Sequence, residues 1–214
     1  MKTLIINGSP KGRNGNTEVI IEKFIGSAKN LYQVCYVANE DPLKLAEYMK
    51  RFDAVIIVMP LYIHAMPGIM MKLIECMERT IDDGKSMGFI VQSGFRESEH
   101  SKYLKRYLTA LAHKLNYTYI GTVVRGGSAG ICMMPEKMNK KLFKQLQNLG
   151  EHFRLTRTFH GDIVEELAKP IRLSKGMSML LYFLFKLGIS DSIFWNGMLK
   201  KNNALDRKFD RPFA

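Results

Sequence analysis

Cysteine is scarce in this 214-residue sequence, which has only three, at Cys35, Cys76 and Cys132. The number is odd, the three residues lie far apart, and none belongs to a CxxC motif. This pattern argues against a disulfide framework, a zinc site and a cysteine-ligated iron–sulfur cluster. We therefore expect a protein without a metal site, in a reducing compartment.

Long hydrophobic runs are also lacking. The longest, MSMLLYFLF at residues 177–185, is too short to cross a bilayer, which needs about 20 apolar residues. The N-terminal stretch MKTLIING has neither the apolar core nor the small-residue cleavage site of a signal peptide. We expect a cytoplasmic protein with no integral membrane segment.

Acidic residues are few: 20 Asp and Glu stand against 32 Lys and Arg, which gives a formal net charge of +12. Nucleic-acid binding would concentrate the basic residues on one face, often with aromatic residues between them. Here they are spread along helical segments and the C-terminal tail, so we expect no nucleic-acid partner. A positive field instead favours phosphate-bearing cofactors and anionic substrates.

What the sequence does contain is a regular alternation. Five apolar stretches of strand length occur at residues 2–7, 31–37, 53–60, 86–94 and 117–127. Helical patterns follow them at residues 15–28, 41–52, 66–81, 98–115 and 135–153, and Asp41 and Pro42 are typical of a helix start. Such alternation predicts an α/β protein, with a parallel sheet covered by helices on both faces.

Ligands of a doubly wound sheet bind beyond the carboxyl ends of the strands. That rule selects four loops, at residues 7–17, 60–67, 93–100 and 126–134. Three of them contain glycine, Gly68 directly follows the second, and the fourth has three glycines and a serine in RGGSAG. We expect one shared ligand site rather than four independent turns.

The first loop, in NGSPKGRNGNTE, lies between a strand and a helix, where backbone N–H groups can hold a phosphate. Lys11 and Arg13 add positive charge, and side chains such as Ser9 and Asn14 add donors. The loop matches neither GxxxxGK[ST] nor GxGxxG, which argues against a P-loop and a Rossmann dinucleotide site. The alternative is an ordinary glycine-rich turn with Thr17 as the helix cap.

The second and third loops contain residues with aromatic or imidazole side chains. In MPLYIHAMPG, prolines at both ends stiffen a loop with Tyr62 and His64. His64 is either a general acid or base or, more commonly for a loop histidine, a solvated or structural residue. In QSGFRESEH, Phe95 is placed to pack on an aromatic ligand, and the alternative is a plain helix entry with Ser98 as its N-cap.

At these residues the chain resembles the NADPH-dependent FMN reductase branch of the flavodoxin-like superfamily. The resemblance rests on GSPKGRNGNTE, MPLYIHAMPGIMMKLIE, SGFRES and RGGSAGI, which follow the first, third, fourth and fifth predicted strands, and it covers about residues 1–155. It implies a flavodoxin-like three-layer α/β/α sandwich with a five-stranded parallel sheet in the order 2-1-3-4-5.

The resemblance also implies FMN at the carboxyl edge of the sheet. Its phosphate would be held by Ser9, Lys11, Asn14, Asn16 and Thr17; its ring would be lined by Pro60, Leu61, Tyr62, Ile63 and His64, with Ser93, Gly94 and Phe95 on the far side. The flavin performs the redox step in this family, so no catalytic residue and no metal is expected.

The implied function is an NAD(P)H oxidoreductase. NADPH or NADH would donate electrons through FMN to a small acceptor such as a quinone, a free flavin or a nitroaromatic compound. The alternative is a non-enzymatic electron carrier like flavodoxin, but such carriers are typically acidic, whereas a charge of +12 suits an anionic nucleotide donor. Family members are commonly dimers or tetramers, so we expect a homodimer or homotetramer.

Residues 156–214 exceed what an FMN-binding domain of residues 1–155 requires. They include the apolar stretch at 176–195, followed by a polar and basic end. Three interpretations stay open for this helical C-terminal extension. It packs on its own domain or on a partner subunit, it covers the flavin as a lid, or it lies on a membrane surface.

Overall fold

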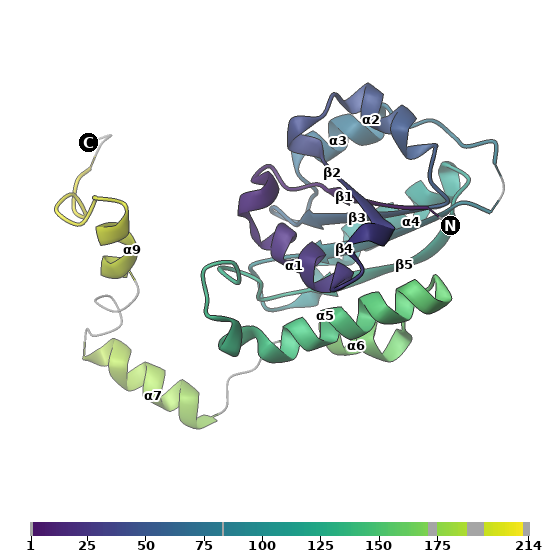
Figure 1. The fold of residues 1–214 in the computed structure, drawn as a ribbon. Coiled ribbons are helices and arrows are strands. Elements are labelled where there is room, and N and C mark those ends of the chain that lie inside the picture. Colours follow the sequence, from purple (N-terminus) through teal and green to yellow (C-terminus); the bar gives the residue numbers. More distant parts are fainter. Residues whose placement is uncertain (1, 83, 171–174, 188–194, 212–214) are drawn as a thin grey trace. The chain divides into compact units, whose positions relative to one another are not determined.

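The computed structural model describes residues 2–82, 84–170, 175–187 and 195–211. The chain forms two compact units, Met1–Ile171 and Arg172–Ala214. The first unit contains one parallel sheet in the order β2-β1-β3-β4-β5 (Figure 1). Its strands are β1 (Thr3–Asn7), β2 (Tyr32–Tyr36), β3 (Ala54–Pro60), β4 (Ser86–Gln92) and β5 (Thr118–Arg125). The predicted flavodoxin-like sheet, with its strand order, is confirmed.

Helices cover both faces of this sheet (Figure 1). They are α1 (Asn16–Ile25), α2 (Pro42–Met49), α3 (Gly68–Glu75), α4 (Lys102–Lys114), α5 (Glu136–Thr156) and α6 (Gly161–Ala168). Helices α2, α3 and α4 share one hydrophobic core with the sheet, and α1, α5 and α6 share the other. The three predicted layers are therefore present.

The two cores explain why the central strands read as continuous apolar runs. Every residue of β1, β3 and β4 is buried, because these strands have helices on both sides. On one face Phe24 of α1 meets Phe153 of α5, with ring centres 5.8 Å apart. The two helices approach this closely because residue 150 is glycine: a Cβ there would lie 1.7 Å from the carbonyl oxygen of Phe24.

The predicted start of α2 is confirmed in detail. Pro42 is its first residue, and the carboxylate of the N-cap Asp41 accepts a hydrogen bond of 3.0 Å from the amide of Lys44. That bond satisfies one of the amides that the first turn of a helix leaves without an intrahelical partner.

One helix prediction is wrong at its end. The pattern at residues 66–81 predicts a helix to residue 81, but α3 ends at Glu75. Beyond it, the amide of Thr80 donates to the carbonyl of Leu115 at the end of α4 (3.0 Å). Tertiary hydrogen bonds thus replace the last helical turns that the apolar spacing suggests.

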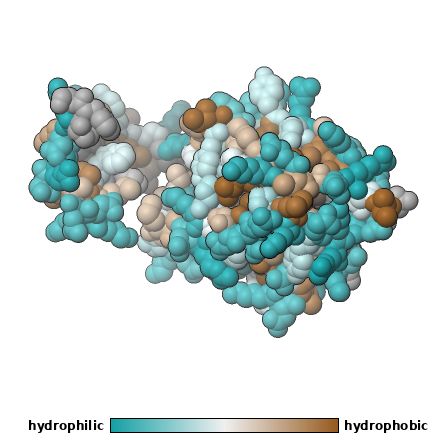
Figure 2. All heavy atoms as spheres, turned by 90° about the horizontal axis from the view of Figure 1, so that it is seen from above, coloured by the Kyte–Doolittle hydropathy of each residue, from teal (hydrophilic) through white to brown (hydrophobic). Residues whose placement is uncertain are grey.

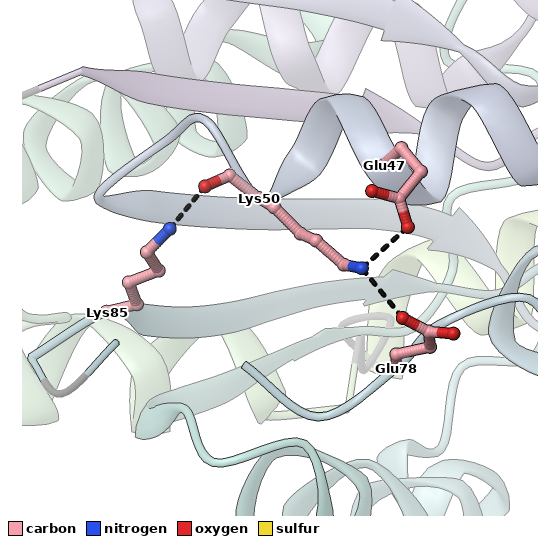
Figure 3. Close-up of polar contacts among 4 residues, drawn as sticks. All are labelled: Glu47, Lys50, Glu78 and Lys85. Carbon is pink, nitrogen blue, oxygen red and sulfur yellow. Dashed lines mark hydrogen bonds and ion pairs between the residues drawn. The ribbon is translucent and has the colours of Figure 1, made fainter. Parts of the chain in front are cut away.

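An ion-pair cluster lies at the amino ends of β3 and β4, the edge opposite the predicted ligand loops (Figure 3). The ammonium of Lys50 is 2.6 Å from Glu47 and 2.8 Å from Glu78, and the hydrogen bonds to these carboxylates raise the pKa of Lys50. The ammonium of Lys85 donates to the carbonyl of Lys50. The cluster joins the α2–β3 connection to the α3–β4 connection, and the groups are too exposed for a large effect on stability.

Helix α6 lies in the range predicted as extension, yet it packs on β5 and α5. The second unit contains α7 (Lys175–Lys186) and α9 (Trp195–Lys201). Part of the apolar stretch predicted as helical, residues 188–194, lies outside the described residues. The division into a domain of residues 1–155 and an extension of residues 156–214 stays a prediction. In the part of the chain that the structure describes, each helix is too short or too polar to cross a membrane.

Candidate functional site

A cleft of about 360 Å³ opens at the carboxyl edge of the sheet. All four predicted loops contribute to it, and the first two follow β1 and β3, the neighbouring strands at which the strand order reverses. Its size is within the range of about 300–1,000 Å³ that is usual for cofactor sites. It is lined by Ser9, Lys11, Asn14, Gly15, Asn16, Pro60, Leu61, Tyr62, Gln92, Ser93, Gly94, Ala129, Gly130, Cys132 and Met133.

The first loop is held by short-range hydrogen bonds to its own residues. The side chain of Asn7, at the end of β1, accepts from the amide of Ser9 (3.0 Å) and donates to the carbonyl of Gly12 (3.2 Å). The hydroxyl oxygen of Ser9 accepts from the amide of Lys11 (3.2 Å). Gly12 has a φ of +51°, a conformation that favours glycine. The loop is therefore a fixed turn that leads directly into α1.

Thr17 lies in the first turn of α1 and is almost completely buried, with 1% of its surface exposed. Its Oγ1 has no hydrogen-bond partner among the residues that the structure describes. The N-cap, Gly15, offers no side-chain cap to the amides of that turn. A buried hydroxyl without a partner costs about 1–3 kcal/mol, so an acceptor supplied by a ligand would remove a penalty that the protein otherwise carries.

A second group of polar side chains makes contacts around the same turn. Glu18 accepts a hydrogen bond from Tyr36 (2.7 Å) and another from Asn7 (2.9 Å). The guanidinium of Arg13 lies 4.6 Å from the centre of the Tyr36 ring. Burial, and then the hydrogen bond to Glu18, raise the pKa of Tyr36 to about 12. The phenol thus stays protonated and continues to donate to the carboxylate.

The second loop contains a tight turn in an unusual backbone conformation. Tyr62 and Ala65 exchange two backbone hydrogen bonds of 2.8 and 3.0 Å. Between them Ile63 has a φ of +47° and His64 a φ of +66°. This conformation is rare for a β-branched residue and costs on the order of 1–3 kcal/mol, a strain that is typical of functional sites. Pro60, Leu61 and Tyr62 line the cleft, whereas Ile63 is 87% exposed and lies outside the lining.

The third and fourth loops are joined by backbone hydrogen bonds. The amide of Ser128 donates to the carbonyl of Ser93 (2.8 Å), and the amide of Gly127 donates to the carbonyl of Phe95 (2.6 Å). Gly126 allows this approach, because a Cβ there would lie 2.6 Å from the carbonyl oxygen of Arg96. The two loops therefore form one wall of the cleft, with Gly94 among its lining residues.

Phe95 and His64 belong to a stack of rings outside the cleft lining. The Phe95 ring stacks on His100 with centres 4.5 Å apart, and the His100 ring is 4.9 Å from that of His64. Nδ1 of His64 is also 3.2 Å from the carbonyl oxygen of His100. The stack links the second loop to the end of the third loop, next to the start of α4.

The contacts place two further polar side chains, Ser98 and Arg125, against α6. Ser98 does not cap α4, whose N-cap is Ser101, and its hydroxyl instead donates to the carbonyl of Ala168 at the end of α6. The guanidinium of Arg125 also turns to α6, where it donates to the carbonyl of Leu167 (3.5 Å). Burial lowers the pKa of Arg125. Both side chains fix α6 to the strand edge and do not line the cleft.

Comparison with protein families identifies the family to which this chain belongs. The model of a family described as NADPH-dependent FMN reductase matches residues 1–125, more than half of the chain. The chain belongs to the NADPH-dependent FMN reductase family. It is therefore a flavin oxidoreductase, with FMN as its cofactor and a nicotinamide nucleotide as its electron donor.

Solved structures agree on the fold. An NADPH-quinone reductase from P. pentosaceus is 19% identical, with 69% of this chain and 96% of the other covered and a TM-score of 0.55. An FMN-dependent NADH-azoreductase from Bacillus anthracis, solved in complex with FMN, is 18% identical, with 71% and 98% covered and a TM-score of 0.55. Identities this low show a shared fold alone. A search of curated protein sequences gave no significant match.

The residues of the cleft fit an FMN reductase. The amides at the start of α1 and the positive charge of the lining residue Lys11 suit a phosphate, and the buried Thr17 hydroxyl lies in the same first turn of α1, outside the lining. Nine of the predicted cofactor residues line the cleft: Ser9, Lys11, Asn14, Asn16, Pro60, Leu61, Tyr62, Ser93 and Gly94. Thr17, Ile63, His64 and Phe95 do not, and the contact of each predicted residue with FMN stays a prediction.

Sequence reasoning missed six residues of the lining: Gly15, Gln92, Ala129, Gly130, Cys132 and Met133. Four of them belong to the fourth loop, whose glycines mark it as a ligand loop without indicating which residues face the cleft. The amide of Cys132 donates to Oδ1 of Asn16 (3.1 Å). This long-range contact brings the fourth loop against the first.

Proposed function

We propose that this chain passes electrons from NADPH or NADH to a small organic acceptor, such as a quinone, a free flavin or a nitroaromatic compound, with FMN held in the cleft described above. The proposal depends most on one observation, the buried Thr17 hydroxyl at the start of α1, which has no partner among the described residues and lies beside the lining residue Asn16. Family membership supports a nucleotide-dependent reductase over a non-enzymatic carrier.

In this proposal the first loop holds the FMN phosphate. Thr17 donates its hydroxyl proton to a phosphate oxygen, and Ser9, Asn14 and Asn16 surround the same group. Lys11 supplies charge, and the N-terminus of α1 adds the positive end of the helix dipole. Hydrogen bonds to a charged group contribute about 1.5–3 kcal/mol each, enough to anchor the cofactor by this end alone.

The remaining loops orient the ring. Pro60, Leu61 and Tyr62 lie on one side of the cleft, and Ser93 and Gly94 lie on the joined wall of the third and fourth loops. We propose that the strained turn at Ile63 and His64 fixes the direction of the backbone at the ring edge, and that Phe95 limits access to it. FMN supplies the hydride-accepting chemistry, and the protein supplies orientation, charge and access.

We also propose that the protein is a homodimer or homotetramer in the cytoplasm. The outer face of α4 exposes Tyr103 and Tyr107, one helical turn apart, and such aromatic side chains are common at protein interfaces. Sedimentation velocity over a range of protein concentrations tests the assembly. A monomer at all concentrations would contradict it.

The function is tested by an anaerobic titration. The purified protein is saturated with FMN, its visible spectrum is recorded, and NADPH or NADH is added. We expect the flavin absorbance to be bleached by at least one nucleotide and restored by an acceptor. Values of kcat/KM for a quinone, FMN and a nitroaromatic compound then identify the acceptor class. A protein that takes up no FMN contradicts the proposal, and bound flavin that neither nucleotide bleaches favours the electron carrier.

A further inference from the structure

Helix α7, in the Arg172–Ala214 unit, carries large apolar side chains that are exposed. Leu180, Tyr182, Phe183 and Phe185 of this helix have between 52% and 71% of their surface exposed, and Leu187, just beyond it, has 69%. Figure 2 shows hydrophobic residues at the surface of this unit beside hydrophilic ones. A surface patch of this kind normally marks a site that binds another apolar surface.

The spacing along α7 places three of its leucines and its two lysines on different sides of the helix. Leu180, Leu184 and Leu187 recur at intervals of four and three residues and share one face of the helix. Lys175 and Lys186, the first and last residues of α7, are eleven positions apart, which is close to three full turns. The two lysines therefore lie on the side of the helix away from these leucines, a side that they share with Met179 and Tyr182, and the helix between them carries no charge.

The charge of the unit indicates what this surface binds. Residues 172–214 contain eight Lys or Arg and three Asp, a net charge of +5. Two copies of such a unit repel one another, whereas an anionic surface attracts it. The only tryptophan of the sequence, Trp195, is 61% exposed at the start of α9, and Lys200 and Lys201 end that helix. Tryptophan and lysine together are typical of helices at a membrane–water interface.

We propose that the Arg172–Ala214 unit binds the surface of an anionic lipid bilayer, with α7 parallel to the membrane plane. The leucine face of α7 enters the acyl boundary, and Lys175 and Lys186 extend toward the lipid phosphates. The helix lies on the bilayer and does not cross it, because twelve residues span about 18 Å, well short of a hydrocarbon core of about 30 Å.

The test uses the full chain with bound FMN and vesicles of phosphatidylcholine, with or without phosphatidylglycerol. Flotation measures binding, and the emission of Trp195 reports its transfer to a less polar environment. We expect binding to the anionic vesicles only, a blue shift of the emission, and a loss of binding at high salt. Lys175→Gln combined with Lys186→Gln should weaken binding roughly 30-fold, about fivefold for each charge removed.

Matched variants distinguish binding by this surface from binding through the overall positive charge or through exposed apolar side chains in general. Lys105→Gln with Arg106→Gln removes the same charge from α4 and should leave binding almost unchanged. Leu180→Asn with Leu187→Asn should abolish binding, whereas Leu31→Asn with Leu43→Asn, which alters equally exposed leucines of the larger unit, should not. The flavin spectrum and circular dichroism confirm that each variant is folded.

Three results would overturn the proposal. The first is a wild-type protein that does not float with anionic vesicles. The second is an equal loss of binding in the Lys105 and Arg106 control, which would assign binding to the overall charge. The third is a dimer, measured by sedimentation without lipid, that Leu180→Asn with Leu187→Asn dissociates; the leucine face of α7 would then bind a second copy of the chain.

Discussion

The amide of Cys132 donates a hydrogen bond of 3.1 Å to Oδ1 of Asn16. The two residues are far apart in sequence, and both line the same cleft. Their contact joins the loop proposed to hold the FMN phosphate to the loop after β5. One amide side chain at the start of α1 thus connects two of the four loops on which the proposed site depends.

Asn16 offers a test of this connection. Asn16→Ala removes the acceptor, so we expect faster hydrogen exchange at the Cys132 amide and FMN binding weaker by about 1 kcal/mol, or roughly fivefold. Asn16→Asp keeps an acceptor oxygen and adds a negative charge. It should preserve the protection of that amide yet weaken FMN binding through repulsion of the phosphate. Equal exchange in all three proteins would contradict the coupling.

Thr17→Val tests the proposed phosphate contact with almost no change of shape. Without FMN we expect the free energy of unfolding to stay equal or to rise by about 1 kcal/mol, because the buried, unpartnered hydroxyl is gone. FMN affinity should fall by about 1.5–3 kcal/mol, measured by fluorescence titration.

Ser86→Ala is the matched control for Thr17→Val. The hydroxyl of Ser86 is also buried without a partner among the described residues, but it lies at the amino end of β4, away from the cleft. This variant should give the same direction of change in stability and no change in FMN affinity. If both variants leave FMN binding intact, Thr17 does not contact the phosphate.

Gly126→Ala should separate the third and fourth loops. The added Cβ would lie 2.6 Å from the carbonyl oxygen of Arg96, and the backbone must move to remove this steric clash. We expect a loss of about 1–3 kcal/mol in the free energy of unfolding, measured with urea, together with weaker FMN binding. Gly161→Ala, where nothing lies within 4 Å of the new methyl group, is the control. Gly126→Ala with wild-type stability would show that the joined wall adapts easily.

Tyr36 gives a pH dependence with a definite sign. Its pKa is raised from 10.0 to about 12 in the folded protein, so folding favours the protonated phenol. The resulting stabilisation is complete below pH 10 and falls as the pH rises from 10 through 12. Tyr36→Phe should cost about 1–2 kcal/mol at neutral pH, because the hydrogen bond to Glu18 is lost. The difference in urea stability between wild type and variant should shrink above pH 10, and a constant difference would contradict this assignment.

The sequence by itself determined the architecture and the edge of the sheet at which the candidate site lies. Continuous apolar strands that alternate with amphipathic helices favour one arrangement, a parallel sheet covered by helices on both faces, because each strand must be buried on two sides. The carboxyl ends of its strands then place the four predicted loops at one edge. The local sequence was also sufficient to predict Asp41 as an N-cap, because its carboxylate accepts a hydrogen bond from an amide only three residues away.

The tertiary structure decided the contacts between residues distant in sequence. It ended α3 at Glu75, turned Arg125 toward α6, stacked Phe95 on His100 and brought Cys132 to Asn16. Each depends on where another segment lies, and the periodicity of a single segment carries no such information. The Thr17 hydroxyl shows the difference most clearly: the sequence allows a helix cap or, by resemblance, a phosphate contact, and only the structure shows that this hydroxyl is buried with no partner among the described residues.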